Sequence, residues 1–459
     1  MPDSHAVVPA AVRLRAHPLV PALALATGAF LCQLDVTAVV VAMPAIGTEL
    51  GFGLAGFAWV MDAYSLAFTG FLVAAGALAD RHGRRRALIA GNLVFALASL
   101  FCGLAWNGPL IWAARALQGA AAAFVITGAI ALVADGYREP AERARAFGAM
   151  GVVSGIAMAV GPSLGGLVAA SFGWRWIFLA NVPLCLVLAW GLPRLVAESR
   201  AADPAPFDVT GIVLMTGALG LAIVALLQAG VATTAGALFW PALLLAASLG
   251  LAKGFAAQQA RRPRPILDVR LFGQRSMAGI AILLVALSVS YWAVLVYLPL
   301  FLERGFGLPA AQVGIALLAA TLPMLVLPPF GARLAARFGW RGLFGAAFVL
   351  MVSGNVALAV AAGLGLGGLA LAGMAASGLG AALAHPQLSG AVVALARPAE
   401  TGMAAAVTVV LRQAGFALGI AMLGATLAAG FVWLFAAAAL IAAIGAGAAL
   451  VLLPAPQRR

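Results

Sequence analysis

Charged residues are scarce in this chain of 459 residues. Asp, Glu, Lys and Arg together make up 9% of it, whereas hydrophobic residues make up 64%. A soluble domain is about 25% charged, because its surface must stay in water. The scarcity excludes a soluble enzyme, a soluble nucleic-acid-binding domain and a disordered chain. It indicates an integral membrane protein whose surface mostly faces lipid.

Acidic residues are rarer than basic ones, with 14 Asp and Glu against 27 Lys and Arg and a net charge of +13. In a soluble protein such an excess indicates nucleic-acid binding. Here the basic residues gather in short loops between apolar runs, a pattern that reports membrane topology instead. We therefore expect a lipid bilayer around the chain and no nucleic-acid partner.

Cysteine is nearly absent. Cys32, Cys102 and Cys185 lie inside apolar runs, and their spacing fits neither a metal site nor a disulfide framework. We expect them to be small buried side chains, with no metal site and no cofactor. The chain also lacks a spaced His/Asp/Glu set, a nucleophile elbow and a phosphate loop followed by lysine, so we expect no enzyme and no ATP-driven pump. Neither a cleavable signal peptide nor an added soluble domain is expected.

Long apolar runs fill the chain, and each is close to the roughly 20 residues that span a bilayer. We predict about fourteen spans, at 19–44, 56–79, 87–106, 109–133, 146–170, 175–196, 209–229, 236–257, 277–302, 309–332, 341–362, 365–388, 401–426 and 429–453. The fold is thus an all-α polytopic membrane protein. The predicted parts are a cytoplasmic tail (1–18), a six-helix half (19–197), a linker with two inserted helices (198–276), a second six-helix half (277–453) and a cytoplasmic tail (454–459).

The basic residues support an even number of spans with both termini in the cytoplasm. Almost all of them fall in loops that this count places inside, such as the run that follows the second span. The exceptions are Arg175 and Arg304, which lie outside, and Arg115 and Arg412, which lie within spans. If the count were wrong by one helix, the basic residues would no longer fall mainly in loops on one side of the membrane.

The two halves carry matching segments. Arg81-His82-Gly83 is matched by Arg337-Phe338-Gly339, and Pro140-Ala141-Glu142 by Pro398-Ala399-Glu400 at nearly the same offset. The pattern predicts an internal repeat with helices 7 and 8 inserted between its copies. One large class of transporters is built from parallel repeats, with the substrate site between the halves.

The segment Gly76-Ala77-Leu78-Ala79-Asp80-Arg81-His82-Gly83-Arg84-Arg85-Arg86 resembles the signature loop of the major facilitator superfamily, G-x-L-a-D-r-x-G-r-r. The resemblance implies a conformational latch made of Gly76, Asp80, Arg81, Gly83, Arg84 and Arg85. Gly76 would allow close helix approach, Asp80 would accept hydrogen bonds from a facing helix N-terminus, and Gly83 would permit a tight turn. Ala336 replaces the aspartate in the second half, so no second latch is expected there.

Helix 5 carries Gly155, Gly161, Pro162, Gly165 and Gly166, which resemble the antiporter motif that marks exporters within the superfamily. The glycines would give a flat face for close packing, and the proline would bend the helix. A packing seam without functional meaning is the alternative. Helix 4 carries Arg115-Ala116-Leu117-Gln118-Gly119, similar to the R-x-x-Q-G motif of the superfamily.

Segments 34–44 and 59–64 resemble those of the fourteen-helix drug:proton antiporter branch, with Val41 where asparagine is common. The resemblance implies a major facilitator fold in the bacterial cytoplasmic membrane. It also implies export of hydrophobic drugs or antibiotics in exchange for protons by alternating access. The alternatives are an exporter of one endogenous metabolite, a non-transporting membrane sensor and a membrane-embedded enzyme.

Three rare charges share one depth band in the first half. Asp35 lies about 13 Å below the outer end of helix 1, and Asp62 and Arg115 each lie about 9 Å below that surface. Burial favours proton uptake by a carboxyl group. We predict that Asp35 and Asp62 bind the coupling proton and that Arg115 controls it, with a static packing cluster as the alternative.

The substrate cavity is expected between the halves. Aromatic rings there would suit a small, hydrophobic, flat or cationic substrate. The candidate lining residues, each of which could instead be packed in the core, are Gln33, Thr37, Gln118, Tyr291, Trp292, Tyr297 and Arg412. Arg412 would contact substrate or pair with a backbone carbonyl, and His385 would be a second proton group or a polar helix-end residue. We expect a monomer.

Overall fold

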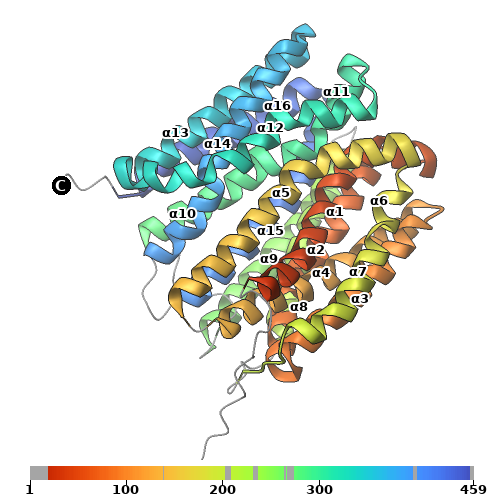
Figure 1. The fold of residues 1–459 in the computed structure, drawn as a ribbon. Coiled ribbons are helices and arrows are strands. Elements are labelled where there is room, and N and C mark those ends of the chain that lie inside the picture. The colour runs from red at the N-terminus through yellow and green to blue at the C-terminus, as the bar shows by residue number, and fades with distance from the viewer. Residues whose placement is uncertain are drawn as a thin grey trace, which may run out of the picture.

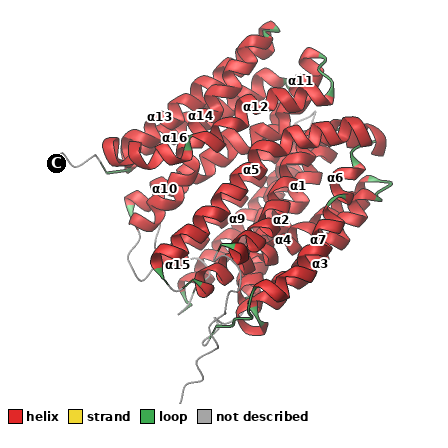
Figure 2. Ribbon diagram, in the orientation of Figure 1, coloured by secondary structure: helices red, strands yellow, loops and turns green. Residues whose placement is uncertain are grey.

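The structure is a computed structural model that describes residues 19–137, 139–201, 208–230, 236–262, 265, 273–395 and 401–454. These residues form helices and short loops, and no strand occurs among them (Figure 2). The all-helical membrane fold expected from the sequence is confirmed. The predicted tail 1–18, most of the tail 454–459 and the repeat segment 398–400 lie outside the described residues.

Helices follow one another along the whole described chain. The first half contains α1 (Val20–Leu50), α2 (Leu54–His82), α3 (Arg84–Gly103), α4 (Gly108–Gly136), α5 (Pro140–Phe172), α6 (Arg175–Leu179) and α7 (Asn181–Leu195). The inserted segment contains α8 (Val209–Gly230), η1 (Gly236–Leu238) and α9 (Phe239–Ala260). The second half contains α10 (Arg275–Leu287), the π-helical turn η3 (Ser288–Ala293), α11 (Val294–Phe306), α12 (Ala310–Val326), α13 (Pro328–Leu364), α14 (Gly367–Leu395), α15 (Thr401–Leu427) and α16 (Phe431–Leu452).

Each predicted apolar run coincides with helix, but the count of fourteen spans is not confirmed. Among the described residues, 12 helices are long and apolar enough to cross a bilayer. The two parts of α2 are bent by 48° relative to each other, and the number rises to 13 if they are counted together as one span. Helix α12 has only 17 residues, and the chain re-enters helix at Pro328. Prolines at 328 and 329 lack the backbone N–H groups that would continue α12 without a break.

Two glycines give the two halves the same turn. Gly83 separates α2 from α3 at φ +113°, and Gly339 interrupts α13 at φ +68°. A residue with a side chain is strained at such a positive φ, so the turn favours glycine in both Arg-x-Gly segments. The shared geometry supports the internal repeat.

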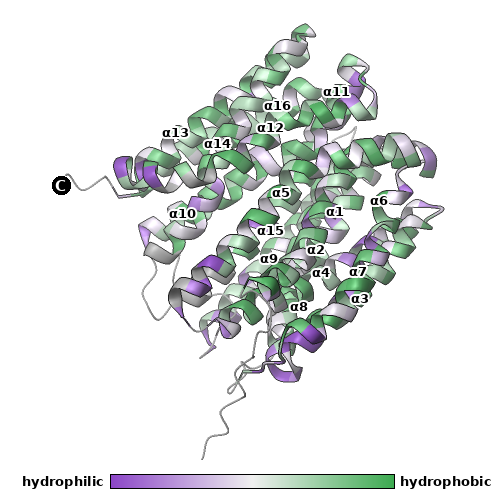
Figure 3. Ribbon diagram, in the orientation of Figure 1, coloured by the Kyte–Doolittle hydropathy of each residue, from purple (hydrophilic) through white to green (hydrophobic). Residues whose placement is uncertain are grey.

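The two halves lie side by side as two helical bundles (Figure 1). Helix α5 packs against α12, and α2 packs against α15, so each half contributes two helices to the seam. Hydrophobic residues cover the middles of the helices, whereas hydrophilic residues gather toward their ends (Figure 3). This is the pattern of a bundle that passes its helix ends into water and its middles into lipid.

The inserted helices pack on one side of this seam. Helix α8 packs against α9 and also against α2 and α15. Asp208 joins the start of α8 to the end of α9, because it accepts hydrogen bonds from the Gly211 N–H at 2.9 Å and the Gln259 amide at 2.7 Å. Burial acts to raise the pKa of Asp208, but these bonds, that of Gln258 and the charge of Arg262 hold it below its ordinary value. These contacts therefore join the two ends of the insertion to each other.

We call the membrane face that carries the loop Arg81–Arg86 the basic side, and the opposite face the far side. Contacts between α5 and α12 hold the halves together over part of their length. The Thr321 hydroxyl donates to the Ala159 carbonyl at 3.0 Å, and the Ser163 hydroxyl donates to the Gly314 carbonyl at 2.8 Å. These contacts run from the middle of α5 toward the far side, where α1 also packs against α11.

Candidate functional site

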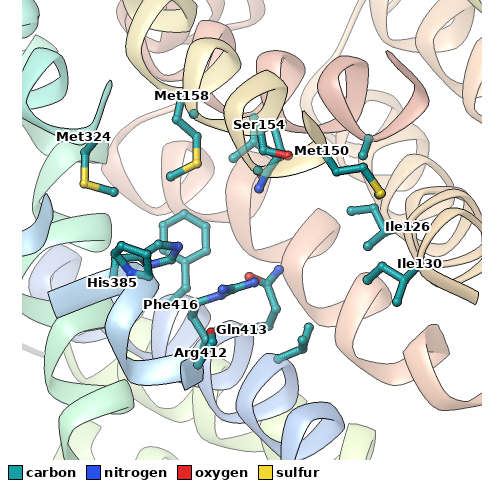
Figure 4. Close-up of a pocket in the computed structure, with 18 of the residues that line it drawn as sticks. Ile126, Ile130, Met150, Ser154, Met158, Met324, His385, Arg412, Gln413 and Phe416 are labelled. Carbon is teal, nitrogen blue, oxygen red and sulfur yellow. The ribbon is translucent and has the colours of Figure 1, made fainter. Parts of the chain in front are cut away.

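A cavity of about 580 Å³ lies between the two halves. It is lined by α1, α2, α4 and α5 from the first half and by α12, α14 and α15 from the second (Figure 4). On α5 its lining runs from Gly148 to Met158, the part nearer the basic side, and the contacts with α12 begin at Ala159. Along α5 the cavity therefore lies on the basic side of the hydrogen bonds that join α5 to α12. The volume is typical of a site for a small organic molecule.

Most of the cavity wall is apolar. Methionine and aromatic side chains supply much of it, from Phe68, Met150, Met158, Met324 and Phe416. The polar lining residues are Gln33, Tyr64, Ser65, Ser154, His385, Ser389, Arg412 and Gln413. None of the described lining residues is Asp or Glu, so Arg412 carries the full charge of the wall. Arg412 has no hydrogen bond to a carbonyl and no carboxylate partner among the described residues.

A buried ionic cluster lies inside the first half, behind this wall. Arg115 of α4 donates through Nη1 to Asp35 Oδ2 of α1 at 2.5 Å, and both side chains are 0% exposed. Gln118 and Asn181 donate to Asp35 Oδ1 at 3.0 and 2.9 Å. Arg115 Nε donates to the Val60 carbonyl at 3.0 Å. The predicted meeting of Asp35 and Arg115 is thus present, and three donors satisfy the carboxylate.

Tyr64 links this cluster to the cavity. Its ring lies under the Arg115 guanidinium at 4.4 Å from the centroid, while the same residue lines the cavity. A molecule in the cavity would therefore contact the side chain that covers the ion pair.

Asp62 makes no described hydrogen bond or ion pair with Asp35 or Arg115, although helix rise placed the three residues at one depth. It is fully buried on α2, and neither of its carboxyl oxygens has a hydrogen-bond partner in the described part of the chain. The common depth of the three residues was predicted from helix rise, but rise alone does not tell which way each side chain points around its helix.

Comparison with known proteins assigns the fold to a family. A family model described as Major Facilitator Superfamily matches residues 25–257 and 270–459. The chain belongs to the major facilitator superfamily. It is a multi-pass membrane transporter, and its family places it outside the enzymes.

Similar proteins extend over most of the chain. The Methylenomycin A resistance protein of Streptomyces coelicolor is 30% identical over 96% of this chain and 92% of its own length. The Multidrug resistance protein Stp of Mycobacterium tuberculosis is 31% identical over 91% of this chain and 77% of its own. The Tetracenomycin C resistance and export protein of Streptomyces glaucescens is 31% identical over 90% and 77%. The resemblance to a drug-exporting major facilitator of the bacterial cytoplasmic membrane is confirmed.

A solved structure shows the same fold. The bacterial homolog of the human lysosomal transporter Spinster, in an inward-facing and unoccupied conformation, has a TM-score of 0.68 over 95% of this chain and 97% of that one. Its sequence identity is 16%, so this likeness concerns the fold alone.

The signature loop of the superfamily makes its described contacts within the first half. Asp80 accepts from Arg84 Nε at 2.8 Å, and Arg84 also lies 3.6 Å from Asp135 of α4. No hydrogen bond between Asp80 and a facing helix N-terminus occurs among the described residues. The expectation for Gly76 is wrong, because a Cβ atom there would meet nothing within 4 Å. Arg81 is exposed, and Gly83 makes the predicted turn.

Glu198 completes this loop, and the sequence analysis missed it. Gly83 precedes α3 and has no side chain that could cap the helix. Glu198, in the chain after α7, accepts instead from the Arg85 N–H at 2.9 Å and the Arg86 N–H at 3.2 Å. Arg85 in turn donates to the Val196 carbonyl at 2.9 Å. The glycine before a helix start was the available signal that a cap must come from elsewhere.

We expect Glu198→Ala to lower the free energy of unfolding by about 1–2 kcal/mol, because the start of α3 loses its cap and a favourable charge at its positive dipole end. Thermal unfolding of the purified protein, followed by loss of the monodisperse fraction, measures the effect. Glu142→Ala, at an exposed site, is the control. Equal melting of the two variants would show that Glu198 does not hold the loop.

The antiporter motif divides into two parts. Gly151 and Gly155 lie at the cavity, and a Cβ atom on either would meet nothing within 4 Å. A Cβ atom on Gly165 would lie 2.5 Å from the Ala38 carbonyl oxygen of α1, and one on Gly161 would overlap the Thr37 side chain. One on Gly166 would lie 2.6 Å from the Ala310 carbonyl oxygen of α12. The predicted face for close packing against other helices therefore begins at Gly161. Helix α5 continues without a break through Pro162.

Several predicted lining residues do not reach the cavity. Gln33 and Arg412 line it, as does His385. The others, which are buried inside one half or between helices, are Thr37, Gln118, Tyr291 and Tyr297, and Trp292 lies behind His385 with ring centroids 5.4 Å apart. Tyr291 donates to the Ala320 carbonyl at 2.9 Å and Tyr297 to the Ile420 carbonyl at 2.6 Å, so both hydroxyls are used in packing.

Proposed function

We propose that this transporter exports small hydrophobic molecules from the cytoplasm in exchange for protons, by opening one cavity alternately to the two sides of the membrane. The observation that carries the proposal is the cavity itself, which lies between the halves and toward the basic side. Basic loops of bacterial membrane proteins face the cytoplasm. In this conformation the cavity would receive its substrate from that side.

The wall chemistry and the relatives support a hydrophobic substrate and outward transport. Flexible methionine side chains such as Met150, Met158 and Met324 adapt to ligands of different shape. The relatives carry names of drug or antibiotic resistance and export. Two of them are named for one antibiotic each, which favours a second candidate function, the export of a single compound by the same mechanism.

The buried carboxyl groups support proton coupling. An unpaired ionised carboxylate is costly to bury, and ionisable residues within membrane helices commonly mark proton paths. Asp35 is held by Arg115, whereas Asp62 has no partner. Proton entry would be coupled to the separation of the two halves if a carboxyl group gained a proton while the pairing of Asp35 with Arg115 changed.

We expect Asp62→Asn to abolish proton exchange while leaving the amount of folded protein unchanged, because asparagine has nearly the same shape and no ionisable group. Inside-out membrane vesicles, acidified inside by respiration, report exchange as loss of the pH gradient when a compound is added. The compounds are ethidium, Nile red and 9-anthracenecarboxylate, which cover cationic, neutral and anionic hydrophobic molecules.

Asp135→Asn makes the same chemical change at a side chain that is 52% exposed and serves as the control. A protonophore should remove the response of the unsubstituted protein. Exchange that persists at full rate in Asp62→Asn would remove Asp62 from the coupling path. Exchange absent for every compound, in vesicles where the protein is folded, would favour the single-compound exporter.

A further inference from the structure

The charge of the cavity wall has one sign. Arg412 and His385 are the basic lining residues, both on the second half, and the described wall contains no carboxylate. The buried carboxyl groups of Asp35 on α1 and Asp62 on α2 do not line the cavity, and Asp35 is already paired with Arg115. A cation that entered would meet the Arg412 guanidinium and no carboxylate in the part of the wall that the structure describes.

Arg412 carries a positive charge that no described residue pairs with. A guanidinium within a membrane helix is costly and is normally paired. Arg412 has neither a carboxylate partner nor a hydrogen-bonded carbonyl in the described residues, and its neighbour Gln413 also lines the cavity (Figure 4). The second alternative considered for Arg412, pairing with a backbone carbonyl, is therefore not found among the described residues.

Two buried ring nitrogens near Arg412 also lack hydrogen-bond partners. His385 Nδ1 and Trp292 Nε1 are buried without a hydrogen-bond partner, and the two rings meet edge to face at 5.4 Å between centroids. Buried polar groups in proteins are normally satisfied, so the unmet nitrogen of His385, a residue that lines the cavity, points to a ligand that meets it. The His385 ring lies on the same wall as Arg412.

The rest of the wall suits a flat apolar body. Met150 and Met158 of α5 lie across the cavity from Arg412 in Figure 4, and Ile126 and Ile130 of α4 continue that surface. Phe416, one turn from Arg412 on α15, adds an aromatic face next to the charge. The cavity thus combines one cationic end with an extended apolar surface.

We propose that the substrate is an amphipathic organic acid, whose ionised carboxylate or phenolate binds Arg412 while its apolar body lies against the methionine wall. This inference rests on the proposed export function and gives its substrate class. Guanidinium and carboxylate groups form paired, charge-assisted hydrogen bonds that are stronger than neutral ones. The sequence-based expectation was a small, hydrophobic, flat or cationic substrate, and this assignment keeps the apolar body but replaces a cationic group with an acidic one.

Three probes with one anthracene body test the sign of the charge. They are 9-anthracenecarboxylate, neutral 9-anthracenemethanol and 9-(aminomethyl)anthracene, which is a cation at neutral pH. Binding to the purified full-length protein is measured by equilibrium dialysis in nanodiscs without a proton gradient, with empty nanodiscs subtracted. We expect the carboxylate to bind at least about tenfold more tightly than the alcohol, as a charge-assisted bond implies, and the cation to bind most weakly.

Two substitutions test whether Arg412 causes the preference for the carboxylate probe. Arg412→Gln should reduce the carboxylate preference to near one while leaving alcohol binding within about threefold, and Arg412→Lys should keep part of it. Arg194→Gln, in the last turn of α7 and outside the cavity, should leave the preference intact. Size-exclusion profiles establish that each variant is folded, and the Lys variant keeps the test meaningful if the Gln variant is not.

The outcomes separate this inference from the export function. A wild-type protein that binds the carboxylate no more tightly than the alcohol, or a preference that survives in Arg412→Gln, overturns the acid assignment. Vesicle exchange of the other probes would then still support export. Conversely, an Arg412-dependent preference with no exchange in vesicles supports acid binding and rejects proton-coupled export.

Discussion

Asp35→Asn is expected to abolish transport and also to lower the free energy of unfolding by about 3–5 kcal/mol. The loss of stability follows from Arg115, which is fully buried and has Asp35 as its carboxylate partner. Removal of that carboxylate leaves a buried guanidinium whose charge is not compensated. The closed ion pair therefore gives Asp35 a role in stability besides its predicted role in proton coupling.

The double variant Asp35→Asn/Arg115→Gln separates stability from transport. Replacing both members of a buried pair is often close to neutral for stability, because no uncompensated charge remains. We expect the double variant to regain most of the lost thermal stability and none of the transport. Thermal unfolding and exchange in inside-out vesicles are measured on the same preparations. Transport by the stable double variant would exclude Asp35 as a proton-carrying group.

Gly165→Ala and Gly155→Ala should differ sharply although both change one motif on one helix. The added methyl group at 165 would lie 2.5 Å from the Ala38 carbonyl oxygen, and backbone of α1 cannot turn away as a side chain can. Forcing an extra methyl group into such a contact costs about 1–3 kcal/mol. At 155 the methyl group would enter open space at the cavity. Helix propensity favours alanine over glycine at both sites.

We therefore expect Gly165→Ala to lower the melting temperature and reduce the exchange rate several-fold, since α1 carries Asp35 one turn away from the contact. Gly155→Ala should melt at or above the wild-type temperature. Both variants are compared in one thermal unfolding experiment and one vesicle assay. Equal stability of the two would refute the close approach of α1 and α5 at Gly165.

The sequence predicted the features that depend on position along a helix. Span positions follow from apolar length, and the turns at Gly83 and Gly339 follow from a repeated glycine. Helix rise placed Asp35 and Arg115 at one depth, and a buried arginine within a membrane span is usually paired.

Features that depend on direction around a helix were not predictable in the same way. Gln118 was expected at the cavity, but it lies at the Asp35 cluster, since an amide suits either place. Tyr291 and Tyr297 were expected at the cavity as aromatic rings, yet their hydroxyls bond to carbonyls of neighbouring helices. Glu198 was missed because its partners in α3 lie far away in sequence. The rotation of each helix is set by packing, which no single residue type reveals.

The lone guanidinium of Arg412 has an electrical consequence. If one acid anion leaves for each proton that enters, two charges move in the direction favoured by a membrane potential that is negative inside. At 100 mV this supplies about 4.6 kcal/mol, enough for an outward gradient of about two-thousandfold. A monovalent cation exchanged for one proton would move no net charge and would depend on the pH difference alone. If Arg412 selects an anion, the membrane voltage therefore adds to the pH difference in driving the cycle.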